Sequence, residues 1–121
     1  MPYADGFVIP IRRKNLDAYR RMARRAGKIW MEHGAVAYHE AAGDDIDQKE
    51  GMGRSFKRLA GLKPGETVLF SWIVYRSRAH RDRVNAKVMA DPRIAKMVEQ
   101  QEMPFDVKRM AYGGFRPIVT M

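Results

Sequence analysis

Apolar positions alternate with a two-residue period in two stretches of the chain, residues 3–11 and residues 67–75. This period is typical of β-strands, because successive side chains of a strand point to opposite faces of a sheet. In the second stretch the two sets of alternating side chains are Val68, Phe70, Trp72, Val74 and Leu69, Ser71, Ile73, Tyr75. Both sets are largely apolar, so this strand is predicted to be buried on both faces.

Each of these strands leads into a segment with the three- and four-residue apolar spacing of a helix, residues 15–33 and residues 79–90. Asn15 and Ser77 are the predicted N-caps of these two helices. Gly34 is predicted to close the first helix with a positive φ angle.

Three further elements follow from turn residues and short apolar runs. Asp91-Pro92 ends the second helix and starts a short helix that reaches about residue 101. Residues 35–42 and residues 108–119 are predicted strands. The latter contains Gly113-Gly114, which predicts a β-bulge or a close approach of another segment to the backbone.

The order of these elements is strand, helix, strand, strand, helix and strand, with residues 43–65 as a candidate mobile flap in the middle. This order predicts an α+β fold, the ferredoxin-like βαββαβ sandwich, whose four-stranded antiparallel sheet carries both helices on one face. Residues 1–121 then form a single domain. Its other sheet face is apolar and uncovered, so we expect a homodimer through this open face.

Composition narrows the class of protein. The 121 residues are 45% hydrophobic and include no cysteine, which excludes disulfides, cysteine-ligated metals and a cysteine nucleophile. The N-terminal residues lack the charged segment and apolar run of a secretory signal. The longest apolar run, residues 68–75, is too short for a membrane-spanning helix. We therefore expect a cytoplasmic protein without a membrane partner.

The formal net charge of +9 raises the alternative of a polyanion partner. Four arginines lie on the polar side of the first predicted helix, namely Arg20, Arg21, Arg24 and Arg25. They would supply phosphate contacts to RNA or DNA without reading bases. No recognition motif such as an aromatic pair for stacking bases accompanies them, so a solvated basic surface is the favoured interpretation.

Several short stretches carry the resemblance of this chain to a known family. They are Tyr3 with Asp5-Gly6-Phe7, Phe70-Ser71-Trp72-Ile73-Val74-Tyr75, Ser77-Arg78-Ala79-His80-Arg81-Asp82, Val84-Asn85-Ala86-Lys87-Val88-Met89, Asp91-Pro92-Arg93, Met103-Pro104-Phe105-Asp106 and Tyr112-Gly113-Gly114-Phe115. Together they resemble the YbaA-like family of small bacterial proteins (domain of unknown function 1428). The resemblance implies the dimeric α/β-barrel superfamily, in which two ferredoxin-like sheets pack their open faces together. That superfamily contains enzymes as well as proteins without known activity, and the family brings no catalytic residues to carry over.

Two residues are candidates for acid-base chemistry. His80 lies one turn before Val84 and points toward the seam between helix and sheet, where it is either a general base or a hydrogen-bonded structural residue. Asp5 lies among apolar residues of a central strand and is either a desolvated acid or the partner of a cation such as Arg109.

An aromatic pocket between helices and sheet is the predicted ligand site, with the alternative that these side chains are plain core. Its candidate residues are Trp30, Tyr38, Trp72, Arg109 and Tyr112. The three histidines, His33, His39 and His80, do not have metal-binding spacing, so no metal and no cofactor is predicted.

The leading hypothesis is a cytoplasmic homodimer that binds a small hydrophobic or aromatic molecule in a cleft between helices and sheet. If the protein is an enzyme, it would work without a cofactor, with His80 or Asp5 moving a proton or orienting the substrate. The alternative is a basic RNA- or DNA-binding dimer that uses the arginines of the first helix.

Overall fold

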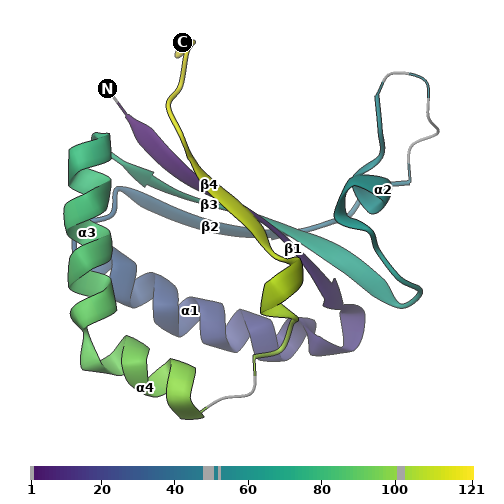
Figure 1. Ribbon diagram of the computed structural model, residues 1–121, viewed down its shortest axis with the longest axis horizontal. Helices are drawn as coiled ribbons and strands as arrows, with labels where there is room; N and C mark the ends of the chain where they lie inside the picture. Colours follow the sequence, from purple (N-terminus) through teal and green to yellow (C-terminus); the bar gives the residue numbers. More distant parts are fainter. Residues whose placement is uncertain (1, 48–50, 52, 101–102) are drawn as a thin grey trace.

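The computed structural model describes residues 2–47, 51, 53–100 and 103–121. One antiparallel sheet organises the fold (Figure 1), with the strand order β2-β3-β1-β4. Its strands are β1 (Tyr3–Arg12), β2 (Ala37–Ala42), β3 (Glu66–Tyr75) and β4 (Ala111–Phe115). The predicted α+β, ferredoxin-like βαββαβ fold is confirmed.

The helices α1 (Leu16–Glu32) and α3 (Arg78–Ala90) cover one face of the sheet (Figure 1). The helix α4 (Pro92–Gln100) lies on the same side but farther from the sheet, and the short helix α2 (Phe56–Ala60) lies on the opposite side. Phe56 of α2 packs edge-on against Phe70 of β3, with ring centroids 6.0 Å apart. None of the described helices combines the length and the apolar character that crossing a membrane requires.

The core lies between the sheet and its covering helices, as the strand periodicity predicts. Its most buried side chains include Tyr75 of β3 and Val88 of α3, each with 0% of its surface exposed. A second apolar cluster joins Ile9 and Ile11 of β1 to Ala23 of α1. The alternation along β1 therefore places one full set of side chains under the helices.

Two of the predicted helix ends are confirmed and one is wrong. The Ser77 side chain accepts a hydrogen bond from the His80 backbone N–H at 3.0 Å, as a cap should. Gly34 has a φ of 113°, which favours glycine. Asn15 does not cap α1 with its side chain, because its amide Nδ2 instead donates to the Pro104 carbonyl oxygen at 3.0 Å.

The last strand is shorter than the predicted 108–119. A short 3-10 turn occupies Val107–Arg109, and strand pairing ends at Phe115, two residues before Pro117, which lacks a backbone N–H. The pairing of β4 with β1 runs without an offset, so Gly113-Gly114 is not a bulge. The close-approach interpretation is correct for Gly114, because a Cβ there would overlap the Tyr3 hydroxyl.

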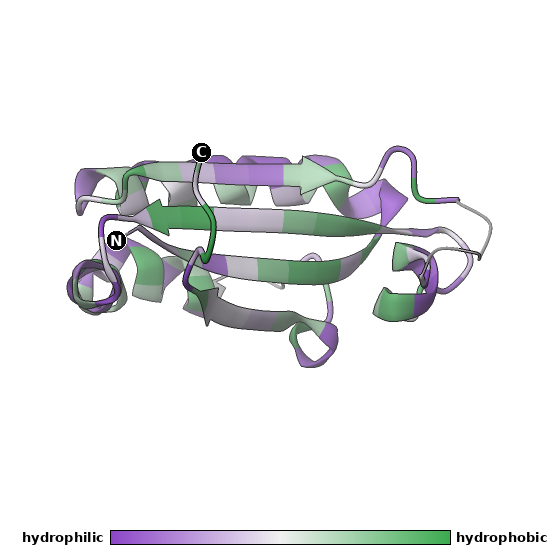
Figure 2. Cartoon of the chain, turned by 90° about the horizontal axis from the view of Figure 1, so that it is seen from above, coloured by the Kyte–Doolittle hydropathy of each residue, from purple (hydrophilic) through white to green (hydrophobic). Residues whose placement is uncertain are grey.

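Figure 2 looks onto the uncovered face of the sheet and shows hydrophobic stretches along its strands. Phe70 and Phe115 are exposed, and Trp72 stacks on His39 of β2 with centroids 4.9 Å apart. Part of the predicted flap, residues 48–50 and 52, lies outside the described residues, so its mobility stays a prediction.

Candidate functional site

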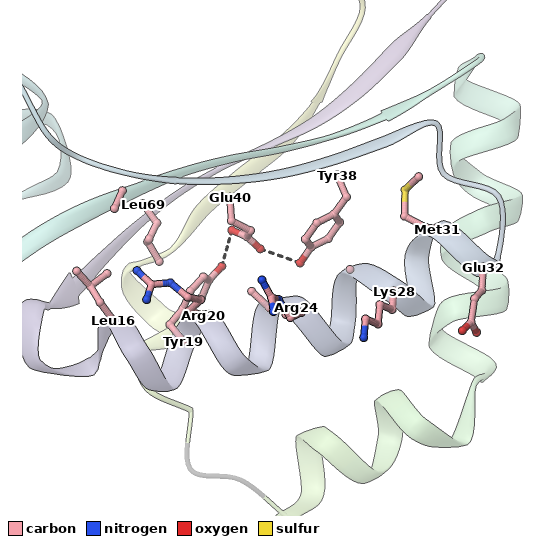
Figure 3. A pocket seen from close by; sticks show the side chains of 13 residues that line it. Leu16, Tyr19, Arg20, Arg24, Lys28, Met31, Glu32, Tyr38, Glu40 and Leu69 are labelled. Carbon is pink, nitrogen blue, oxygen red and sulfur yellow. Dashed lines mark hydrogen bonds between the residues drawn. The ribbon is translucent and has the colours of Figure 1, made fainter.

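An open groove with a volume of about 960 Å³ runs between α1 and the edge strand β2 (Figure 3). Its walls include apolar side chains from three elements, among them Leu16 and Ala23 of α1, Ala42 of β2 and Leu69 of β3. β2 is an edge strand, with a neighbouring strand on one side only. The groove beside it is therefore accessible from solvent.

The carboxylate of Glu40 lines this groove and accepts hydrogen bonds from three hydroxyl groups. The Tyr19 hydroxyl donates to Glu40 Oε1 at 2.8 Å, and the Ser71 hydroxyl donates to the same oxygen. The Tyr38 hydroxyl donates to Oε2 at 2.7 Å (Figure 3). These four residues, from α1, β2 and β3, are called the Glu40 cluster below.

Simple geometry brings the Glu40 cluster together. Tyr38 and Glu40 are two residues apart on β2 and therefore share a face. Ser71 is the direct partner of Glu40 in the pairing of β2 with β3. Tyr19 lies on the buried side of α1, with 6% of its surface exposed, above these strands.

The two tyrosines remain protonated donors. Burial raises the pKa of Tyr19 and Tyr38 far above the ordinary value, and the negative charge of Glu40 raises both further. The Glu40 side chain is therefore held by hydroxyl donors rather than by a cation.

A smaller cavity of about 130 Å³ lies beneath the groove, between α1 and the sheet. Tyr19, Tyr38 and Glu40 line both spaces, so the cluster separates them. Trp30 lines the inner cavity, with its ring centroid 6.2 Å from that of Tyr38. Gly27 of α1 makes room for Tyr38, since a Cβ at Gly27 would lie 2.8 Å from that ring.

The outer edge of the groove is basic. Arg20, Arg24 and Lys28 line it at four-residue spacing, which places them along one side of α1. Arg20 is paired with Asp17 at 3.1 Å. Glu32, at the end of the groove, is paired with Arg93 of α4 at 2.6 Å. The site thus combines an apolar wall, a hydroxyl-bound carboxylate and a cationic rim.

The family described as protein of unknown function (DUF1428) matches residues 2–107 of this chain. The chain belongs to the DUF1428 family. The uncharacterized protein YbaA of Escherichia coli K12 is 41% identical over 119 residues, which cover 98% of each chain. The same figures hold for the uncharacterized protein YbaA of Shigella flexneri. The resemblance read from the sequence is confirmed.

Solved structures with low sequence identity share the fold of this DUF1428 protein. A NIPSNAP family protein with unknown function from Agrobacterium tumefaciens has a TM-score of 0.59 at 16% identity, covering 96% of this chain and 87% of that one. A NIPSNAP-like domain protein from Burkholderia xenovorans has a TM-score of 0.57 at 14% identity, with coverages of 97% and 85%. A dimeric ferredoxin-like protein from an uncultured marine organism has a TM-score of 0.52 at 11% identity, with coverages of 100% and 98%.

His80 of the DUF1428 chain is buried, with 5% of its surface exposed. Its Nδ1 accepts a hydrogen bond from the Arg76 backbone N–H at 3.0 Å. Burial lowers its pKa, and the charges of Arg76 and Arg83 lower it further. His80 does not line the groove or the inner cavity. This geometry favours the structural interpretation, and an acid-base role stays a prediction.

Asp5 is also buried, but its cation is not the expected Arg109. Arg81 of α3 donates to Asp5 Oδ1 at 3.2 Å, and Asn85 Nδ2 donates to Asp5 Oδ2 at 3.3 Å. Arg109 instead binds both carboxylate oxygens of Glu66, at 2.7 and 2.8 Å. Asp5 and Arg81 are 76 residues apart in the chain. They approach each other because α3 packs against β1.

The predicted aromatic pocket is divided in the structure, which brings together Trp30 and Tyr38 only. Trp72 faces the opposite side of the sheet, where it stacks on His39. Arg109 lines a separate groove near the start of α1. Tyr112 is 72% exposed on the other edge strand.

Sequence reasoning missed three members of the Glu40 cluster, Tyr19, Glu40 and Ser71. A signal was present, because Ser71 is the one polar position in the apolar run of β3 and Glu40 shares a face with Tyr38. The predicted helix-end position of His33 is where the structure places it, with Nε2 2.8 Å from Asp91 Oδ2. Among the described residues, no three histidine or acidic side chains gather as a metal site would require.

Proposed function

We propose that this DUF1428 protein is a homodimer that binds a small hydrophobic or aromatic molecule in the groove between α1 and β2. The observation that carries the proposal is a groove of about 960 Å³ with apolar walls around the Glu40 cluster. Ligand sites are commonly concave, mostly apolar and equipped with a few placed polar groups, at volumes of roughly 300–1,000 Å³. Both the size and the lining fit this description.

A fluorescence titration with N-phenyl-1-naphthylamine, a neutral aromatic probe that brightens in apolar surroundings, tests this proposal. Ala42 of β2 is exposed and lines the groove, so the variant Ala42→Trp places a large ring in it. We expect wild type to bind the probe with saturation and Ala42→Trp to lose this binding. The control Ala86→Trp adds the same ring on the exposed surface of α3 and should bind as wild type does. Equal binding by all three proteins would contradict the proposal.

The homodimer part of the proposal rests on the open face of the sheet. Phe70 and Phe115 expose 47% and 61% of their surface there, and contiguous exposed apolar surface marks interaction sites. The similar structure from an uncultured marine organism is described as a dimeric ferredoxin-like protein. A second copy of this chain offers the same apolar face in return, which a two-fold contact requires.

Light scattering with a charge placed in the open face tests the dimer. Wild type should have twice the chain mass of 14.0 kDa, and Phe70→Asp should have the mass of one chain. The control Val98→Asp, on an exposed position of α4, should leave the mass unchanged. A wild-type protein that stays at the mass of one chain would contradict the proposed assembly.

A second candidate function is binding of RNA or DNA by the arginines of α1. Arg21, Arg24 and Arg25 are exposed, and no ion pair engages them within the described parts of the chain. Arg25 also lines a surface groove with Arg93 and Lys96, which extends the basic face onto α4.

This candidate predicts affinity for a single-stranded RNA oligonucleotide that falls steeply as salt is added. Replacement of Arg20, Arg21, Arg24 and Arg25 by glutamine should abolish that affinity. Weak binding that salt does not change would exclude this function while leaving the groove proposal intact.

A further inference from the structure

We infer that the ligand of the α1–β2 groove is an amphipathic organic acid, with an apolar body, a hydroxyl or N–H donor at one end and an anionic group at the other. This inference rests on the proposed function and names the chemical class of its ligand. It follows from two features at different depths of one groove, the carboxylate of Glu40 inside and the cations of α1 at the edge.

The inner feature calls for a donor on the ligand. Only hydroxyl groups donate to Glu40 among the residues that the structure describes, and Oε2 receives one such bond, from Tyr38. A carboxylate oxygen accepts two hydrogen bonds, so Oε2 has a free acceptor position in the groove. Tyr19 and Ser71 hold the other oxygen and fix the carboxylate in place. An apolar ligand without a donor would desolvate this charge without replacing its hydrogen bonds to water.

The outer feature calls for an anion. Arg24 and Lys28 line the groove one helical turn apart, and neither has a carboxylate partner within the described residues. The nearby acids are already engaged, because Asp17 is paired with Arg20 and Glu32 with Arg93. An arginine and a lysine at the rim of an apolar groove can both bind a carboxylate, sulfonate or phosphate.

The apolar wall joins these two features. Leu16, Ala23 and Leu69 line the groove together with the Tyr38 ring. A planar aromatic or short aliphatic body would bury its surface there, with its donor toward Glu40 and its anionic group toward the rim. A site that forms a hydrogen bond to a ligand strongly rejects ligands that lack the bonding group. An apolar pocket rejects a ligand with an extra polar group only weakly. The groove should therefore discriminate by polar groups more than by shape.

Isothermal titration calorimetry with three naphthalene probes tests this inference. The probe 6-hydroxy-2-naphthoate has both polar groups, 2-naphthoate has only the anion, and 2-naphthol has only the donor. We expect 6-hydroxy-2-naphthoate to bind at least about tenfold more tightly than either of the others, since a hydrogen bond to a charged group contributes roughly this factor or more. Equal affinities for the three probes would overturn the inference.

Two variants assign the polar ends. Arg24→Gln should weaken binding of both naphthoates and leave 2-naphthol unchanged, whereas Arg21→Gln, on a position of α1 that does not line the groove, should change none of them. Glu40→Gln should weaken the two hydroxylated probes and spare 2-naphthoate. If Glu40→Gln fails to fold, the wild-type series and Arg24→Gln still decide the inference.

Failure of the inference and failure of the proposed function give different results. If all three probes bind wild type equally and Ala42→Trp abolishes all binding, the groove is a ligand site but not one for amphipathic acids. If Ala42→Trp leaves the affinity of every probe unchanged, both the proposed function and the inference are wrong.

Discussion

The Tyr19 hydroxyl lies 2.8 Å from Glu40 Oε1 and donates a hydrogen bond to it. This bond ties α1 to β2, an edge strand that pairs with β3 alone. It also orients the carboxylate in the groove, because Tyr19 is buried and has little rotational freedom. One contact thus contributes both to the stability of the sheet edge and to the shape of the proposed ligand site.

Loss of the Glu40 carboxylate should destabilise the fold. In Glu40→Leu the buried hydroxyls of Tyr19 and Ser71 lose their acceptor, and an unsatisfied buried donor costs about 1–3 kcal/mol. We expect the free energy of unfolding, measured by urea denaturation, to fall by roughly that amount. Glu99→Leu, at an exposed position of α4, is the matched control and should change it little. Equal stability of Glu40→Leu and wild type would show that the three hydrogen bonds contribute nothing net.

Gly27→Ala should destabilise the protein, although alanine is the better helix former. In an exposed helix the change from glycine to alanine stabilises by roughly 0.5–1 kcal/mol. Here the added methyl group would lie 2.8 Å from the Tyr38 ring, and overpacking of this kind costs about 1–3 kcal/mol. The sign of the effect should reverse in a Tyr38→Ala background, where the ring is absent. Stabilisation by Gly27→Ala in both backgrounds would mean that Tyr38 does not occupy this position.

Acid should remove the stabilisation that Glu66 provides. The hydrogen bonds from Arg109, followed by that from the Lys63 backbone, lower the pKa of Glu66 to about 2 from an ordinary value of 4.5. A carboxyl whose pKa is lower in the folded than in the unfolded protein stabilises the fold above the unfolded value. This contribution is lost as the pH falls from about 4.5 toward about 2.

Urea denaturation of wild type and Glu66→Gln across this pH range measures the effect. The variant should be less stable than wild type at neutral pH, and the difference should shrink steadily once the pH is below 4.5. A difference that stays constant down to pH 2 would show that the Glu66 pKa is not lowered in the folded protein.

His80 should stay neutral in the folded protein at pH values where a free histidine is charged. Burial, with the charges of Arg76 and Arg83, lowers its pKa from the ordinary 6.5. The unfolded chain then binds more protons than the folded one below pH 6.5, so stability should decline as the pH falls through this region. An NMR titration of the His80 ring should give a midpoint below 6.5. A midpoint at or above that value would indicate a partner that holds the charged form.

Stability and ligand binding of a His80 variant distinguish a structural role of this residue from a functional one. His80→Asn should lower the unfolding free energy, because it disturbs a buried side chain and its hydrogen bond from the Arg76 backbone. It should leave the affinity for N-phenyl-1-naphthylamine unchanged, since His80 does not line the groove. A variant that folds as well as wild type but no longer binds the probe would favour the functional interpretation of His80.

The fold could be predicted from the sequence because its signals are local. The alternation along residues 67–75 marks β3, and the apolar spacing from Leu16 marks α1. Ser77 capped the helix it preceded, because that hydrogen bond spans only three residues. Asn15 did not cap its helix, since the Pro104 carbonyl, 89 residues away in the chain, competes for its side chain. Tertiary contacts of this kind leave no pattern in a single sequence.

The candidate site was less predictable for the same reason. Glu40 and Ser71 are 31 residues apart, and only the register of β2 against β3 makes them neighbours. Trp72 looked equivalent to Trp30 as an aromatic wall, yet the pleat of β3 directs it to the opposite face of the sheet. The aromatic residues of the sequence therefore could not show which of them face the helices, where the groove lies, and which face the opposite side of the sheet.

Chemical-shift mapping by NMR would locate a bound ligand in the groove between α1 and β2 directly. Backbone amide shifts would be recorded while N-phenyl-1-naphthylamine is titrated into the wild-type protein. We expect the largest changes in residues 19–31 of α1 and residues 38–42 of β2, with smaller changes elsewhere. Changes centred instead on Phe70, Trp72 and Phe115, with α1 and β2 unaffected, would place ligand binding on the open face of the sheet. That result would contradict a ligand site in the groove.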